Sequence, residues 1–319
     1  MLRILSGAVL VVLGYIALGG IMSAVAQSAK ASDSIRGQMV DIGQGRQLHL
    51  ICEGTSSSAP TVLLEAGAFG FSADWGAVQQ ALLAKGIRSC AYDRAGLGAS
   101  PLAAGPRDGL AISQDLEALM TAANEPGPFI LVGHSMAGAY VTLFALRNPP
   151  KIAGLVMVDA APPIANTIKQ VNGFVSAFAR ASRLAAFGAS VGLFKPLIWT
   201  NLADKIGLPP QASAKKRRAF ASGAHNRAAA EEVAQWPKAA EQARALGKLD
   251  PALPVAVVTA GPATGIRKDW KQIQAMPALE SRSGFVHHVT EASHNTLLGQ
   301  AYCANIVQAI QEVAEAAAK

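Results

Sequence analysis

The stretch Phe129-Ile130-Leu131-Val132-Gly133-His134-Ser135-Met136-Ala137-Gly138 decides how the rest of this chain is organised. A short apolar run, typical of a buried strand, ends at Gly133, and Ser135 follows two residues later. Small and helix-forming residues then continue to about Leu146. This order predicts a strand, a very tight turn and a helix, with the Ser135 hydroxyl held at the helix N-terminus, where the dipole and free N–H groups favour a developing negative charge.

Strands and helices alternate on both sides of this stretch. The pattern predicts strands at 38–42, 47–52, 61–65, 87–92, 152–159, 254–260 and 285–289, and helices at 75–85, 110–123, from about 269, and at 298–317. Gly43-Gln44-Gly45-Arg46 marks a hairpin between the first two strands. Such alternation predicts an α/β fold in which a mostly parallel sheet carries helices on both faces.

The alternation is interrupted once, after Pro162-Pro163. From there to about residue 249 the chain reads as amphipathic helices with breaks at glycines and prolines. We therefore expect a core made of residues 37–160 and 250–319, with residues 161–249 inserted as a helical cap over the sheet.

The N-terminus is not expected to belong to this fold. Arg3 is followed by no charge until Lys30, and residues 4–26 are mostly apolar. Ala24-Val25-Ala26 fits the small-x-small cleavage site of a secretory signal. The apolar stretch is nearly as long as a membrane span, so residues 1–26 are either a cleaved signal peptide, which we favour, or an uncleaved membrane anchor. Both place the body, after a linker at 27–36, outside the cytoplasm, as a periplasmic, secreted or membrane-anchored protein.

The composition argues against nucleic acid as a partner. The net charge is +7, but charged residues make up only 15% of the chain, and Lys215-Lys216-Arg217-Arg218 is the one dense basic cluster. It has no interleaved aromatic residues, so a solvated helix face explains it better. No metal or other cofactor is expected, because no zinc-type spacing and no phosphate-binding glycine loop occurs.

Cys52 ends one predicted strand and Cys90 begins another. An exported protein can form a disulfide, so these two cysteines are the candidate pair. Two buried free thiols explain the sequence equally well.

Four features taken together resemble the α/β-hydrolases. They are the Gly133-x-Ser135 turn, the glycine-rich loop 66–70, the run Asp93-Arg94-x-Gly96-x-Gly98-x-Ser100, and a late histidine. One departure is that the second glycine of the family's G-x-S-x-G elbow is replaced by Ala137, with Gly138 one residue later. The resemblance covers residues 37–317 and implies the α/β-hydrolase fold, with Ser135 as nucleophile.

The serine needs a base to take its proton and a third group to orient that base. Among six histidines, His294 alone lies on a loop just past the last predicted strand, so it is the expected base. Two aspartates are candidates for the acid. Asp159 closes the strand after the elbow and is favoured, whereas Asp269, in the usual region of the family, is explained as a helix N-cap paired with Gln272.

The resemblance also implies two backbone donors for the oxyanion. One is the N–H of Met136, directly after the nucleophile. The other is the N–H of Ala68 or Phe69 in the loop after the strand 61–65, and of these Ala68 is our choice. We expect Asp93 and Arg94 to fix loops rather than to act on a substrate, and Glu65 has no role in this scheme.

The expected function is that of a serine hydrolase without cofactor. It cleaves an ester, or a related acyl bond, of a small to medium hydrophobic substrate through an acyl-enzyme on Ser135, because the cap is rich in Leu, Phe and Ala. An amidase, a lyase or a cofactor-free haloperoxidase uses the same triad and stays an alternative. A non-catalytic exported binding module is the alternative from another class. A nucleophilic aspartate is disfavoured because position 135 is serine.

Overall fold

A computed structural model describes residues 36–125, 127–200 and 206–319. In this part of the chain eight strands form one sheet in the order β1-β2-β4-β3-β5-β6-β7-β8. The strands are β1 (Gln38–Asp41), β2 (Gln47–Glu53), β3 (Thr61–Glu65), β4 (Ser89–Asp93), β5 (Phe129–His134), β6 (Ile152–Val158), β7 (Val255–Ala260) and β8 (Gly284–Val289). Each predicted strand is present within two residues of its expected bounds.

The sheet is antiparallel at one edge and parallel elsewhere. β1 pairs with β2, and β2 with β4, in antiparallel register, so the predicted hairpin at 43–46 is confirmed. All pairs from β4 through β3, β5, β6 and β7 to β8 are parallel. The carboxyl ends of the parallel strands therefore meet at one edge of the sheet, which is where ligands of such sheets bind.

Helices cover both faces of the sheet, because successive strand residues point to opposite sides and both sets are apolar. On one face Val62 and Leu64 pack with α2 (Gly76–Ala84) and α9 (Cys303–Ala317). On the other face Leu63 and Leu131 pack with α3 (Gly109–Ala122) and α4 (Ala137–Arg147). The 3₁₀ turn η2 (Ser72–Trp75) precedes α2, and η3 (Pro149–Lys151) leads into β6.

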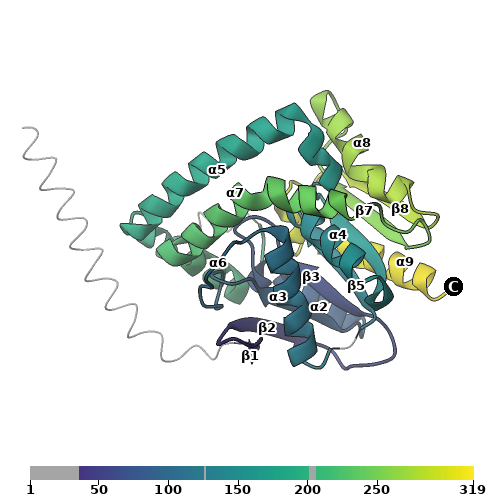
Figure 1. Cartoon of the computed structure of the whole chain (residues 1–319), viewed down its shortest axis with the longest axis horizontal. Coiled ribbons are helices and arrows are strands. Elements are labelled where there is room, and N and C mark those ends of the chain that lie inside the picture. The colour runs from purple at the N-terminus through teal and green to yellow at the C-terminus, as the bar shows by residue number, and fades with distance from the viewer. Residues whose placement is uncertain (1–35, 126, 201–205) are drawn as a thin grey trace, which may run out of the picture.

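The chain between β6 and β7 is helical. It contains η4 (Pro163–Thr167), α5 (Lys169–Ser190), η5 (Lys195–Trp199), α6 (Pro210–Phe220) and α7 (Gly223–Ala245). Figure 1 shows α5 and α7 running side by side across one side of the molecule, and their contacts agree with this view. The prediction of an α/β-hydrolase fold with an inserted helical cap is confirmed, and we call α5, α6 and α7 the cap helices.

Two helix boundaries differ from the prediction. α8 (Ile266–Leu279) begins three residues before Asp269, and its N-cap is Gly265, so the expected N-cap role of Asp269 was wrong. The last helix does not begin at Leu298: η6 (Thr296–Leu298) is followed by a turn, and α9 starts at Cys303. At this break Gly299 lies so close to the backbone of Ile206 that a Cβ would have no room.

A disulfide joins Cys52 to Cys90, which lie directly opposite each other on β2 and β4, so the alternative of two free thiols was wrong. In the described residues no helix is long and apolar enough to cross a membrane. The predicted signal peptide or anchor at 1–26, and almost all of the linker at 27–36, lie outside the described residues.

Candidate active site

The turn between β5 and α4 holds Ser135 in a strained conformation, with φ of +59°. Its N–H donates to the carbonyl of Val158 at 3.1 Å, and its carbonyl accepts from the N–H of Ala161 at 2.9 Å. A Cβ at Gly138 would lie 2.5 Å from the Ala161 oxygen. Glycine is therefore needed at 138, where α4 approaches the segment after β6, whereas a methyl group fits at the fully buried Ala137. This explains the departure from the family's elbow pattern.

Ser135, His294 and Asp159 lie in one hydrogen-bonded row. The imidazole Nδ1–H donates to Asp159 Oδ2 at 2.6 Å, and the Ser135 hydroxyl donates to the imidazole Nε2 at 3.0 Å. Asp159 directly follows β6, and its Oδ1 accepts from the Gln274 amide at 3.0 Å and from the N–H of Ala260 at 3.3 Å. Three elements far apart in sequence thus supply one constellation.

The charge of Asp159 decides which tautomer His294 adopts. Burial raises the pKa of the Asp159 carboxyl, but the hydrogen bonds and charge of His294, together with the Gln274 amide, outweigh burial. The pKa therefore lies below its ordinary value, and the group is a carboxylate at neutral pH. A carboxylate only accepts hydrogen bonds, so Nδ1 carries the imidazole proton and Nε2 is left to accept from the serine.

The alternative acid lies elsewhere. Asp269 is exposed in the first turn of α8, and in the described part of the chain His294 Nδ1 bonds Asp159 instead. The structure brings Asp159, and not Asp269, to the imidazole.

Sequence reasoning missed His134, whose ring packs against that of His294 with centroids 4.5 Å apart and planes inclined by 33°. His134 is buried, and its Nε2–H donates to the backbone carbonyl of His294 at 3.0 Å. Burial, followed by the nearby charge of His294, lowers the pKa of His134 to about 3, so this ring stays neutral. It supports the loop that carries His294 without adding a second positive charge. The position of His134 inside the elbow motif indicated that it lies near Ser135. It was excluded as the base because it precedes the serine in the sequence.

Gln274 was also missed. Its amide reaches Asp159 from α8, the helix after β7. No local sequence signal distinguishes it from the other polar residues of that helix.

The loop after β3, residues 66–70, lies against Ser135. A Cβ on Gly67 would be 2.8 Å from the Ser135 Cβ and 3.0 Å from the His134 carbonyl oxygen, so only glycine permits this approach. The next residue is Ala68. Among the hydrogen bonds within the described residues, neither the N–H of Ala68 nor that of Met136 has an acceptor. These are the two donors expected for an oxyanion.

Side chains hold the carbonyls of this loop from the opposite side. Arg94 donates to the carbonyl oxygens of Ala66 at 2.6 Å and of Gly67 at 3.0 Å. The peptide from Gly67 to Ala68 is planar and trans, so the bond to the Gly67 oxygen turns the Ala68 N–H to the other side. This favours Ala68 over Phe69 as the loop's donor.

Two cap residues hold the carbonyl of Phe69 in the same loop. Lys216 Nζ donates to the Phe69 oxygen at 2.8 Å, and His225 Nε2–H donates to it at 3.3 Å. The N–H of Gly98 donates to His225 Nδ1 at 3.1 Å. Burial, followed by the charge of Lys216, lowers the pKa of His225 to about 4, so His225 is neutral and keeps this donor and acceptor arrangement.

Arg94 also joins the core to the cap through two buried carboxylates. It pairs with Glu65 on β3 at 2.5 Å and with Glu232 on α7 at 2.8 Å. Burial tends to lower the pKa of Arg94, but the two carboxylates raise it well above the ordinary value. The expected loop-fixing position of Arg94 is thus observed, and Glu65, which had no role in the sequence scheme, is its partner.

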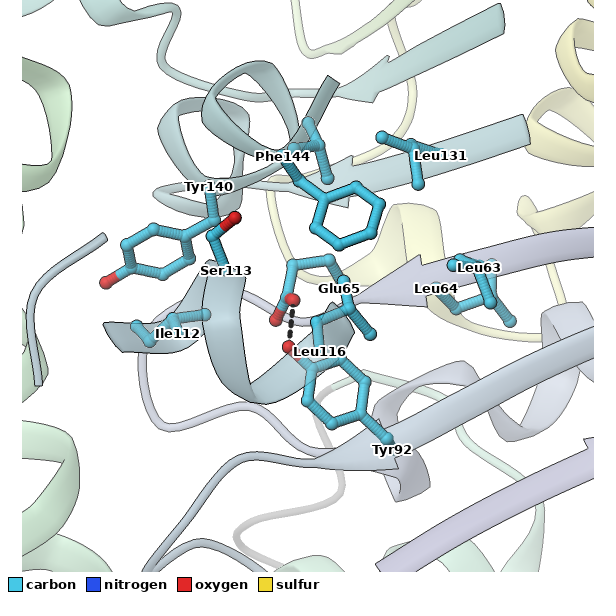
Figure 2. Close-up of a pocket in the computed structure, with 11 residues that line it drawn as sticks. Leu63, Leu64, Glu65, Tyr92, Ile112, Ser113, Leu116, Leu131, Tyr140 and Phe144 are labelled. Carbon is cyan, nitrogen blue, oxygen red and sulfur yellow. Dashed lines mark hydrogen bonds between the residues drawn. The ribbon is translucent and has the colours of Figure 1, made fainter. Parts of the chain in front are cut away.

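Figure 2 shows a small cavity beside Glu65, where the hydroxyl of Tyr92 donates to the carboxylate. Ser113 and Tyr140 also line it, and in the described residues their hydroxyls have no hydrogen-bond partner. Ser135 does not line this cavity, so the cavity belongs to the buried network beneath the site and not to the reacting centre.

The described residues offer one group of three side chains with metal-ligand atoms close together, Cys52, Cys90 and Glu125. Its two cysteines form the disulfide, so they have no thiolate to give to a metal.

The surroundings of the triad are apolar. One hydrophobic cluster joins the elbow, the loop after β3, the cap and α8; its members include Ala68, Phe69, Met136, Ala161, Val175, Phe178, Trp236, Trp270 and Ile273. A hydrocarbon group next to Ser135 would therefore contact apolar side chains.

A serine, an imidazole and a carboxylate joined in this order, at the carboxyl edge of a mostly parallel sheet, define the class of α/β-type hydrolases. The chain belongs to the alpha/beta hydrolase family, whose family model matches residues 62–309.

Relatives of known structure share the fold. A candidate epoxide hydrolase from Pseudomonas aeruginosa superposes with a TM-score of 0.68 at 19% identity, over 88% of this chain and 96% of that one. A thermophilic esterase from Thermogutta terrifontis superposes with a TM-score of 0.62 at 22% identity, over 87% and 99%. The mouse sn-1-specific diacylglycerol lipase ABHD11 is 30% identical over 122 residues, which are 38% of this chain and 39% of that protein. The matches to the first curated relatives span less than half of those proteins' lengths.

Proposed function

We propose that this hydrolase cleaves a carboxylic ester through an acyl-enzyme on Ser135. The observation that carries the proposal is the His294 imidazole, which bonds the Ser135 hydroxyl on one side and the Asp159 carboxylate on the other. A serine hydroxyl is a weak nucleophile unless a base within hydrogen-bond reach accepts its proton as it attacks.

In the proposed reaction His294 Nε2 takes the Ser135 proton while Oγ adds to the ester carbonyl. The carbonyl oxygen becomes negative and is held by the N–H groups of Met136 and Ala68, an effect worth about 3–4 kcal/mol per donor in known hydrolases. The imidazolium then gives its proton to the leaving alcohol. A water molecule, deprotonated by the same imidazole, releases the acid and restores the serine. Asp159 stabilises the imidazolium in both halves.

The apolar cluster around the elbow supports a small to medium hydrophobic ester as substrate. Phe69 and Phe178, whose ring centroids are 6.1 Å apart, bring aromatic surface to the loop that carries the proposed oxyanion donor. The esterase and lipase among the relatives agree with this reaction class.

The test is covalent labelling with a fluorophosphonate probe, followed by mass mapping of the labelled peptide, and kinetics on p-nitrophenyl esters of increasing acyl length. We expect one label, on Ser135, and saturation kinetics with esters. The Ser135→Ala variant should lose both, whereas Ser293→Ala, an exposed serine beside His294, should keep both. If Ser135 is labelled and the protein hydrolyses amides but not esters, the amidase alternative is correct. Full ester turnover by Ser135→Ala would remove the proposal.

A further inference from the structure

The outward face of α5 is apolar. Leu184 is 74% exposed, Phe187 70% and Phe174 68%, and Val191 follows one turn after Phe187. Ala177 and Ala181 lie on the same exposed side, at the three- and four-residue spacing of one helix face. Trp199, at the end of η5, is 62% exposed. We call the face formed by Phe174, Leu184, Phe187 and Val191 the α5 face.

The charged residues in the segment that carries this face have one sign. Residues 160–200 contain Lys169, Arg180, Arg183 and Lys195 and no aspartate or glutamate. Arg180 is one turn before Leu184, and Arg183 is one turn before Phe187. Both arginines are exposed. An apolar helix face flanked by basic residues, with tryptophan and phenylalanine, is typical of a helix that lies in the interface of an anionic bilayer.

Aromatic rings connect this face to the candidate active site. The exposed Phe174 stacks on Phe178, with centroids 6.0 Å apart and planes inclined by 16°. Phe178 contacts Phe69, at 6.1 Å, in the loop after β3. The three rings form a continuous apolar surface from the outside of the cap to Ala68, beside Ser135.

We propose that the α5 face lies on an anionic lipid bilayer, and that the ester substrate reaches Ser135 from the bilayer along Phe174, Phe178 and Phe69. The choice of a bilayer over a second copy of the chain follows from charge. In a twofold contact the same patch meets itself, so the arginines of the two copies would lie near one another. A bilayer that contains anionic lipid meets both the apolar and the basic part of the face.

The surface part of this inference does not need catalysis, and only the entry route rests on the proposed function. The first test is cosedimentation of the full chain with vesicles of phosphatidylcholine, and of phosphatidylcholine and phosphatidylserine in equal parts. We expect stronger binding to the anionic vesicles. Because each basic side chain near such a surface strengthens binding by roughly fivefold, Arg180→Gln with Arg183→Gln should weaken it about thirtyfold.

The apolar part is tested by Leu184→Asp with Phe187→Asp. The matched control is Leu279→Asp, a leucine that is 73% exposed on α8. We expect the double variant to lose vesicle binding and the control to keep it. Equal vesicle binding by the wild type, the double variant and the control would overturn the proposal. The proposal would also be overturned if the double variant changed a dimer into a monomer and left vesicle binding as it was. Far-UV circular dichroism of each variant separates loss of binding from loss of fold.

Residues 1–26 are themselves apolar, so a direct report from the α5 face is needed. The variant Phe187→Trp provides it, because Phe187 is 70% exposed on α5. We expect vesicles with brominated acyl chains to quench a fluorescence component that this variant has and the wild type lacks. Vesicle binding without this quenching would assign the contact to another segment and refute the inference. Ser135→Ala should bind vesicles as the wild type does. If the wild type binds vesicles but hydrolyses no ester, the proposed function is refuted and the proposed membrane contact of the α5 face still stands.

Discussion

The substitution Gly67→Ala tests whether the loop after β3 takes part in the reaction. Its new Cβ would lie 2.8 Å from the Ser135 Cβ, whereas ordinary contacts of a Cβ begin at 3.4 Å. The loop and the serine must therefore separate by about 0.6 Å. A displacement of about 1 Å in a reacting constellation costs on the order of a hundredfold in rate, and loss of one oxyanion donor costs a hundredfold to a thousandfold. We expect kcat to fall by about one to two orders of magnitude.

Stability should fall modestly, because the new Cβ must displace its neighbours and overpacking costs roughly 1–3 kcal/mol. Part of this cost is offset, since Gly67 does not have a positive φ and alanine restricts the unfolded chain. The matched control is Gly173→Ala in α5, where a Cβ would have no neighbour within 4 Å. The assays are kcat and KM on a p-nitrophenyl ester, the rate of fluorophosphonate labelling, and thermal unfolding of both variants.

The expected pattern is specific to a positioning effect. Gly67→Ala should stay folded, with a modestly lower melting temperature, and should lose kcat with a nearly unchanged KM. Gly173→Ala should retain the wild-type rate. A Gly67→Ala enzyme with full kcat and an unchanged melting temperature would show that the loop supplies nothing to the transition state. In that case the Ala68 N–H would have to be dropped as an oxyanion donor.

Three further predictions concern the acid, the disulfide and the buried histidines. Asp159→Asn should lower kcat by about 10⁴, as in known triads, because the amide no longer fixes the imidazole tautomer. The control Asp269→Asn should have no effect on kcat. A comparable loss of kcat in Asp269→Asn would contradict the assignment of Asp159 as the acid. Replacing Cys52 and Cys90 together by serine should lower the free energy of unfolding in urea by about 2–4 kcal/mol, since the bridge closes a loop with a sequence separation of 38; unchanged stability relative to Cys303→Ser would refute this. The folded pKa of about 4 for His225 lies below its unfolded value, so its contribution to stability is full above about pH 6.5 and is lost as the pH falls toward 4. Between pH 7 and pH 5 wild type should therefore lose about 2 kcal/mol more than His225→Gln in urea unfolding, and parallel pH profiles would refute the neutral, buried histidine.

The sheet and the elbow were predictable because each depends on local pattern. Residues 129–132 are apolar and the whole strand 129–134 is buried, as expected of a strand covered on both faces, and the small residues after Ser135 admit the tight turn. His294 was found by its place after the last strand. The choice between Asp159 and Asp269 depends on the order of the strands in the sheet, which no local pattern reveals. Asp159 reaches the imidazole because β6 lies next to β5.

The supports of the site were largely out of reach of sequence reasoning. Three of these supports are Gln274, Lys216 and His225. Each forms a hydrogen bond with a residue more than a hundred positions away in the sequence. The start of α8 was misread because Asp269 and Gln272 imitate a capping box. The helix begins instead at Ile266, after the N-cap Gly265, whose φ of +53° is open to glycine at little cost.

The buried charges explain how a glycine-rich loop stays in place beside a reactive serine. Arg94 is 2% exposed, and its donors are used on two carboxylates and on the carbonyls of Ala66 and Gly67. Buried ion pairs add little to stability when compared with an apolar core of the same volume, so their use here is better explained by geometry. One rigid guanidinium fixes the loop to Glu65 in the sheet and to Glu232 in α7 at the same time. The cap therefore does more than cover the site: its helix α7 holds the cation that turns the Ala68 N–H away from the core.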